Sequence, residues 1–184
     1  MIIGLAGNKG SGKDTVADIL VEDHGFDRVA FADPVHKKVK FLLQLKDHNE
    51  YNQVKRTKLT WQDNKGNIHF VDGRHLIREI GMLMLSYNKD QFTQYVESRF
   101  FKMNGKVVVT DMRFEHEHFM LKRNNAIFCK VKRPGFVSDN HITEKGFDDS
   151  EMHFIVENDS SIKALRKKVN ELVEKVEYVH TSRK

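Results

Sequence analysis

The stretch Gly7-Asn8-Lys9-Gly10-Ser11-Gly12-Lys13 decides the fold of this chain. It has the spacing of a phosphate-binding loop: a glycine, four residues, a second glycine and a lysine. Residues 1–6 form a short apolar run before it, which is typical of a buried parallel strand. After the loop, apolar residues recur at helical spacing up to Gly25, namely Val16, Ala17, Ile19 and Leu20. The pattern therefore predicts a strand, a glycine loop and a helix in succession.

This local order gives the loop a chemical role. Successive backbone N–H groups and the positive end of the following helix can face one anionic group, and Lys13 can reach the β- and γ-phosphates of a nucleoside triphosphate. Position 14 is Asp, where a Ser or Thr hydroxyl normally touches Mg²⁺, and Thr15 follows it. Either residue could contact the metal. The competing interpretation is a glycine-rich turn that only caps a helix, and the presence of all three elements together argues against it.

The rest of the chain alternates short strands with helices. Strands are predicted at 28–31, 106–110, 127–131 and 153–156. Helices are predicted from Asp33-Pro34 onward and over the apolar stripes within 76–84, 92–100, 115–124 and 162–176. The alternation favours an α/β fold with a mostly parallel sheet and right-handed crossovers. Residues 46–73 are polar and irregular. Asp63–Asn67 is predicted to be a turn between Trp61 and Ile68–Phe70, and either a small hairpin or a mobile flap fits this pattern.

Composition limits the classes of protein to consider. The chain has 184 residues, enough for one compact domain, and its single cysteine, Cys129, excludes an intramolecular disulfide. No apolar run approaches the roughly 20 residues needed to span a bilayer, and the first ten residues do not resemble a signal peptide. We therefore expect a cytoplasmic protein without a membrane partner. The net charge of +5 predicts an acidic partner, either nucleic acid or a small phosphorylated molecule.

A second chemical element follows the strand at 106–110. Asp111 lies at its predicted carboxyl end, where open parallel sheets bind their ligands, and its carboxylate can bind Mg²⁺ or the waters around it. Arg113 can contact two phosphate oxygens at once, a geometry that lysine cannot reproduce. The competing interpretation is that Asp111 caps the next helix and Arg113 is merely exposed. We predict Lys13, Asp111 and Arg113 to be the catalytic residues.

Two other patterns are set aside. His116 and His118 are two residues apart on a predicted helix and do not share a face, so we predict no zinc site there. The basic runs at 37–40 and 163–168 lack the interleaved aromatic residues of a single-strand binder. They are interpreted as solvated helix faces, and no stable nucleic-acid partner is expected.

Six blocks of sequence occur in the order found in one known family. The chain resembles the bacteriophage deoxynucleoside monophosphate kinases in residues 7–15, in Phe31-Ala32-Asp33-Pro34, in Asp111-Met112-Arg113 with Glu117, in Arg133-Pro134-Gly135, in 138–144 and in Glu157-Asn158-Asp159-Ser160. The resemblance implies a P-loop NTPase-type three-layer sandwich with a mostly parallel five-stranded sheet and helical acceptor-binding and lid segments. It also implies an ATP- and Mg²⁺-dependent transfer of the γ-phosphoryl group to deoxynucleoside 5′-monophosphates.

The resemblance assigns residues to each ligand. ATP would be held by Gly10, Ser11, Gly12, Lys13, Asp14, Thr15 and Arg133. The deoxynucleoside monophosphate would be bound by Lys9, Val35, His36, Arg74, Arg78, Gly81 and Arg113. Mg²⁺ would be bound by Asp14, Thr15 and Asp111. Asn158-Asp159 would either lie against the adenine or cap the last helix, and the cap is favoured.

The resemblance also predicts how the chain is organised. We expect a single domain over residues 1–184, with an acceptor-binding insertion at about 32–102 and a lid at about 132–150. A homodimer is a further property of the family. Met82-Leu83 and Ser86 depart from the family pattern, so no base preference is carried over. Two alternatives remain: another P-loop kinase that acts on a small molecule, and a nucleotide-dependent nucleic-acid-binding module.

Overall fold

The computed structural model describes residues 1–103, 105–135 and 147–182. The chain divides into two compact units. Unit 1 consists of Met1–Phe31 and Val96–Lys184, and unit 2 consists of Ala32–Tyr95. Unit 1 contains the phosphate loop, and unit 2 contains most of the segment predicted to bind the acceptor.

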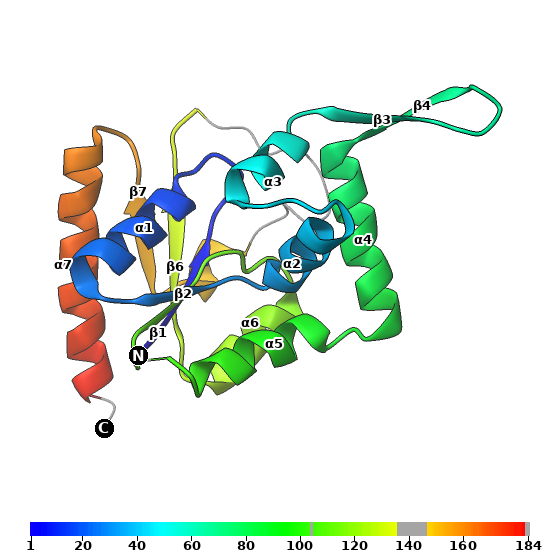
Figure 1. Cartoon of the computed structure of the whole chain (residues 1–184). Helices are drawn as coiled ribbons and strands as arrows, with labels where there is room; N and C mark the ends of the chain where they lie inside the picture. Colours follow the sequence, from blue (N-terminus) through cyan, green and yellow to red (C-terminus); the bar gives the residue numbers. More distant parts are fainter. Residues whose placement is uncertain (104, 136–146, 183–184) are drawn as a thin grey trace. The chain divides into compact units, whose positions relative to one another are not determined.

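Unit 1 is built on a five-stranded sheet whose neighbouring strands are all parallel (Figure 1). The strand order is β2-β5-β1-β6-β7, with bounds Asp27–Val29, Val107–Val109, Ile2–Ala6, Ile127–Lys132 and Phe154–Glu157. The five predicted strands and their parallel pairing are therefore confirmed. Since β1 is the central strand, the loop that follows it opens at the middle of the sheet's carboxyl edge.

Helices cover both faces of this sheet. Helices α1 (Lys13–His24) and α7 (Ile162–Ser182) pack side by side on one face, where Ile3 and Leu5 of β1 join their apolar residues in one buried cluster. Gly4 faces the other side, and a Cβ built on it would lie 3.1 Å from Leu121 of α6 (Glu115–Arg123). Successive strand residues thus point to opposite helical layers, which makes unit 1 a three-layer sandwich.

Helix α7 supplies much of the core of unit 1. The predicted apolar stripe is buried against the sheet and α1, with Leu165, Val169, Leu172, Val173 and Val176 each at most 4% exposed. Full burial of one such side chain contributes roughly 1.5–3 kcal/mol. The packing of α7 therefore holds α1, and with it the end of the phosphate loop, firmly on the sheet.

Unit 2 is mostly helical. It contains α2 (Asp33–Leu42), α3 (His48–Val54), α4 (Gly73–Tyr87) and the first half of α5 (Gln91–Phe100). The hairpin predicted within 46–73 is confirmed as antiparallel β3 (Lys58–Gln62) and β4 (Ile68–Asp72). Helix α3 was not predicted. Its N-cap is Asp47, whose side chain accepts hydrogen bonds from the backbone N–H groups of Asn49 and Glu50.

Glycine determines how α4 begins. A Cβ on Gly73 would lie 1.8 Å from the carbonyl oxygen of Val54, so no other residue fits without moving the backbone. This close approach sets the first turn of α4 against the last turn of α3. Further along α4, a Cβ on Gly81 would lie 3.5 Å from Cγ2 of Val35, because α2 packs on α4.

Within the described ranges, every helix is too short or too polar to cross a bilayer.

Candidate functional site

The phosphate loop is held in place by a residue from the far end of the sheet. Gly12 has φ 94°, and a Cβ there would lie 2.3 Å from Nδ2 of Asn158. The same Nδ2 donates a hydrogen bond to the carbonyl oxygen of Ser11 at 2.9 Å. Glycine at position 12 therefore lets Asn158, which follows β7, reach the loop backbone and fix it.

This contact corrects the favoured role of Asn158-Asp159. The cap of α7 is Ser161, whose Oγ accepts a hydrogen bond from the N–H of Ala164 at 3.3 Å. Asp159 instead forms an ion pair with Lys168 at 2.7 Å. The capping interpretation was wrong because Asn158 instead reaches the loop that follows β1, across β6 in the sheet, and spacing along the chain does not reveal this contact.

Two polar groups of the loop, the Lys13 ammonium and the Ser11 hydroxyl, have no partner in the described residues. Lys13 is half-buried, and its ammonium makes no hydrogen bond or ion pair there. The buried Oγ of Ser11 also has no hydrogen-bond partner. Burying a cation or a hydroxyl without a partner is costly. An anion with several oxygen acceptors is the kind of ligand that would satisfy both.

The carboxylate of Asp14 is engaged with a residue of β2. Nη2 of Arg28 lies 2.6 Å from the Asp14 carboxylate, and Nη1 of the same guanidinium lies 2.7 Å from Asp18. These pairs join the first turns of α1 to β2. Arg28 could not be predicted from the sequence, because no motif marks a cation on one strand as the partner of acids on a neighbouring helix.

Asp111 joins two strand ends. Its Oδ1 accepts a hydrogen bond from the N–H of Phe31 at 2.6 Å, which connects the carboxyl ends of β5 and β2. The start of α6 is instead satisfied by Glu117, whose carboxylate accepts from the N–H of Phe114. Asp111 thus lies at the predicted edge of the sheet, and the helix is capped by another residue.

Glu117 supports the segment that carries Arg113. It is only 3% exposed, and its Oε2 accepts hydrogen bonds from the N–H groups of Arg113 at 2.7 Å and Phe114 at 3.0 Å. Burial, and then the nearby charge of Asp111, raises the pKa of the Glu117 carboxyl to about 8. The guanidinium of Arg113 is exposed and makes no hydrogen bond or ion pair with another described side chain. Glu117 belongs to one of the sequence blocks that resemble the family, but the sequence alone predicts no role for it.

The predicted metal ligands are oxygen donors. Thr15 offers a hydroxyl, and Asp14 and Asp111 offer carboxylates. Among the residues with described placement, no group of three or more His, Cys, Asp or Glu side chains comes together. Mg²⁺ takes one or two protein carboxylates and otherwise keeps water or binds substrate phosphates, so a sparse set of oxygen donors fits this ion.

The predicted lid lies mostly outside the described residues, which end at 135 and resume at 147. Arg133 is exposed directly after β6, at the same edge of the sheet as the phosphate loop. Where the chain resumes, Asp149 forms ion pairs with Lys130, at 2.8 Å, and with Lys132. These pairs attach the short 3₁₀ helix η2 (Asp149–Glu151) to β6.

The predicted acceptor residues fall in both units. Lys9 is exposed in the phosphate loop of unit 1. In unit 2, Arg74 and Arg78 lie one turn apart on α4, and both are exposed without an ion pair to a described residue. His36, in the first turn of α2, has its Nδ1 3.9 Å from the Asp33 carboxylate. Val35 lies next to Gly81 through the packing of α2 on α4.

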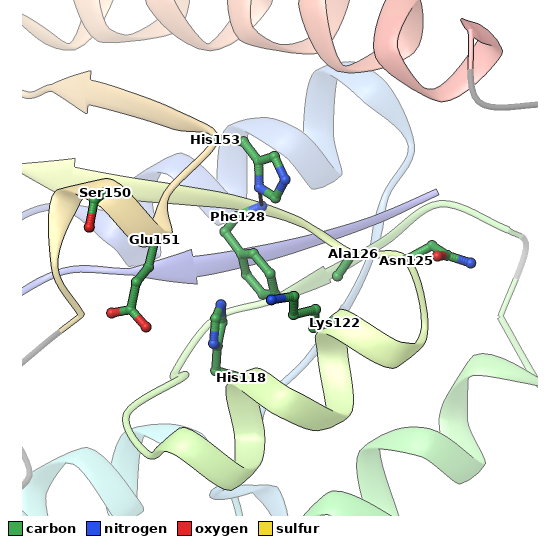
Figure 2. A pocket seen from close by; sticks show the side chains of 8 residues that line it. All are labelled: His118, Lys122, Asn125, Ala126, Phe128, Ser150, Glu151 and His153. Atoms are coloured by element: carbon green, nitrogen blue, oxygen red, sulfur yellow. Dashed lines mark hydrogen bonds between the residues drawn. The ribbon is translucent and has the colours of Figure 1, made fainter.

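Unit 1 also has a cavity of about 530 Å³ at the opposite edge of its sheet (Figure 2). It is lined by His118 and Lys122 of α6, by residues of η2, and by residues at the amino ends of β6 and β7, including Phe128 and His153. Figure 2 shows His118 below the ring of Phe128, and the Phe128 N–H donates to Nδ1 of His153 at 3.0 Å. Because the strands are parallel, this cavity lies at the end of the sheet away from the phosphate loop.

Comparison with known proteins agrees with these features. Solved structures of similar fold include TT1252 from Thermus thermophilus (TM-score 0.54, 16% identity, 95% of this chain and 97% of that one). Another is the dephospho-CoA kinase from Campylobacter jejuni (TM-score 0.53, 14% identity, 95% and 96%). A protein of Acanthamoeba polyphaga mimivirus, named as a candidate deoxynucleotide monophosphate kinase, is 32% identical over 152 residues, which are 76% of this chain and 78% of the relative. The deoxynucleotide monophosphate kinase family model matches residues 1–88 and 83–169. The chain therefore belongs to the deoxynucleotide monophosphate kinase family, and its fold is that of a P-loop kinase.

Proposed function

We propose that this protein transfers the γ-phosphoryl group of ATP to the 5′-phosphate of a deoxynucleoside monophosphate. The products are ADP and a deoxynucleoside diphosphate, a precursor of deoxynucleoside triphosphates. The observation that carries the proposal is the half-buried Lys13, which has no partner among the described residues and belongs to a glycine loop at the carboxyl end of the central strand. Family membership supports the choice of acceptor.

The donor is bound by the residues of the loop. Backbone N–H groups of residues 10–15 and the positive end of α1 bind the ATP phosphates, and the Lys13 ammonium binds the β- and γ-phosphates. Asn158 keeps the loop backbone in one conformation through the carbonyl of Ser11, so little ordering is needed when ATP binds. Arg133 adds a positive charge at the carboxyl edge of the sheet, where the phosphate loop lies.

The acceptor is bound through its charge. Arg113 contacts two oxygens of the acceptor phosphate, and the family resemblance adds Lys9, Val35, His36, Arg74, Arg78 and Gly81. A phosphoryl transfer needs little covalent help from the protein; alignment of donor and acceptor and neutralisation of charge supply most of the catalysis. Mg²⁺, bound with ATP near Thr15, Asp14 and Asp111, would neutralise part of the phosphate charge.

A coupled assay of ADP formation tests the proposal. ATP and Mg²⁺ are supplied with each of the four deoxynucleoside monophosphates in turn, and then with ribonucleoside monophosphates or dephospho-CoA. We expect at least one deoxynucleoside monophosphate to raise ADP release well above the rate with ATP alone. Stimulation by dephospho-CoA only would indicate another small-molecule kinase. DNA binding that weakens steeply with salt, without any stimulation, would indicate a nucleic-acid-binding module.

Arg113 offers a second test. Arg113→Ala should reduce acceptor use by at least 100-fold in kcat/KM while ATP binding, measured by calorimetry, stays nearly unchanged. Arg113→Lys should recover only a small part of the activity, because a lysine cannot contact two oxygens in a fixed plane. Equal losses in ATP binding and acceptor use would contradict the role assigned to Arg113.

A further inference from the structure

Tyr51 of α3 has a buried hydroxyl that nothing in the described chain satisfies. The side chain is 0% exposed, and its Oη has no hydrogen-bond partner among the described residues. Buried hydroxyl groups in native proteins are nearly always hydrogen-bonded, since an unpaired one lowers stability. This exception therefore calls for a functional explanation.

Nitrogen-bearing side chains surround this phenol. The imidazole of His36 lies 4.8 Å from the Tyr51 ring and that of His48 lies 5.8 Å from it, measured between centroids. The ammonium nitrogen of Lys55 lies 4.5 Å from the centroid of the Tyr51 ring. The positive charge of Arg74 also acts on the phenol. His36, His48, Tyr51, Lys55 and Arg74 are called the Tyr51 cluster.

Packing within unit 2 explains the cluster. His36 comes from α2, His48 and Tyr51 from α3, and Arg74 from α4. The contact of Gly73 with the Val54 carbonyl places the first turn of α4 beside the end of α3, and α2 packs on both helices. Three helices thus bring side chains that can carry positive charge close to the Tyr51 side chain.

The chemistry of the cluster defines its ligand. Burial raises the pKa of Tyr51 well above its ordinary value, and Arg74 offsets only part of the effect, so the phenol keeps its proton and can donate a hydrogen bond. Imidazole, ammonium and guanidinium groups are also donors when protonated. A phosphate monoester, with its double negative charge and several acceptor oxygens, suits such a set.

We propose that the Oη of Tyr51 donates a hydrogen bond to the 5′-phosphate of the acceptor nucleotide, beside the guanidinium of Arg74. Oη is buried, so binding requires a neighbouring side chain to move. Arg74 can turn toward such a phosphate, because it is exposed and its guanidinium has no hydrogen bond to a described residue. The inference rests on the proposed function and adds to it a residue of the acceptor site.

The variant Tyr51→Phe isolates the hydroxyl. It should raise the KM for the deoxynucleoside monophosphate by about 10- to 100-fold, as expected for a lost hydrogen bond to a charged group, while the KM for ATP stays unchanged. Its melting temperature should be equal to or above that of the wild type, since phenylalanine leaves no unpaired hydroxyl. A loss of acceptor affinity without loss of stability is not expected from a purely structural residue.

Tyr87→Phe is the matched control. Tyr87 lies on α4 of the same unit but is 86% exposed, so its hydroxyl should be dispensable for both substrates. Calorimetric titration of the deoxynucleoside monophosphate, without ATP, gives a readout independent of catalysis. We expect the same weakening in Tyr51→Phe as in the kinetic experiment, and no change in Tyr87→Phe.

The outcomes separate the inference from the proposed function. An active wild type whose acceptor KM and affinity are unchanged in Tyr51→Phe overturns the inference alone. A wild type that binds the monophosphate more tightly than Tyr51→Phe but never phosphorylates it overturns the proposed function and supports the phosphate site. A wild type that neither binds nor phosphorylates any monophosphate overturns both.

Discussion

The buried carboxyl of Glu117 should make the stability of this protein depend on pH in a defined way. The group is 3% exposed and receives two backbone hydrogen bonds, yet burial and the charge of Asp111 raise its pKa to about 8. The perturbation is Glu117→Gln, which keeps the shape of the side chain and one acceptor oxygen but cannot ionise. It therefore separates the cost of the buried charge from the contribution of packing.

The magnitude follows from the difference between folded and unfolded states. The ordinary pKa of the group is 4.5, so the folded value of about 8 corresponds to roughly 5 kcal/mol at 1.36 kcal/mol per unit. The folded state binds the proton more tightly, so the unfolded state holds fewer protons between pH 4.5 and pH 8. The free energy of unfolding consequently falls as pH rises from 4.5 to 8. The cost of ionising the buried carboxyl is absent below pH 4.5 and complete above pH 8.

Urea denaturation at intervals from pH 5 to pH 9 measures this effect. We expect the free energy of unfolding of Glu117→Gln minus that of the wild type to increase as pH rises, by several kcal/mol in all. This difference should level off above pH 8. Glu115→Gln removes an exposed negative charge from the same first turn of α6 and serves as the matched control. A difference between wild type and Glu117→Gln that stays constant within about 0.5 kcal/mol would refute the reasoning.

Three further predictions concern the phosphate loop. Gly12→Ala should lower the free energy of unfolding by about 1–3 kcal/mol and weaken ATP binding. The new Cβ would clash with Nδ2 of Asn158, and alanine is strained at the φ of 94° that Gly12 adopts. Thermal melts and ATP titrations measure the two effects. Asn158→Ala should raise the KM for ATP several-fold and leave that of the acceptor unchanged, and an equal rise in both would contradict the role of its contact with Ser11. Arg28→Ala should cost less than about 1 kcal/mol in urea denaturation, because its ion pairs with Asp14 and Asp18 are largely solvent-exposed; a larger loss would show that they are stronger than typical surface pairs.

The sequence by itself determined the elements of this protein that depend on short-range spacing. The strand, glycine loop and helix within residues 1–24 could be predicted because a short apolar run, the glycine spacing and helical periodicity each involve only a few neighbouring residues. The hairpin of β3 and β4 and the apolar stripe of α7 were predicted for the same reason. Helix α3 was missed because it is short, with only Tyr51 and Val54 buried, although Asp47 and Glu50 at its start carry the spacing of a cap.

Only the tertiary structure decided which distant groups meet. The contact of Asn158 with Ser11 spans 147 residues, and it exists because β7 and β1 lie in one parallel sheet, on either side of β6. The hydrogen bond from Phe31 to Asp111, the burial of Glu117 and the unpaired hydroxyl of Tyr51 likewise depend on strand order and helix packing. Spacing along the chain encodes local geometry, whereas the environment of a side chain is set by neighbours that folding brings from elsewhere.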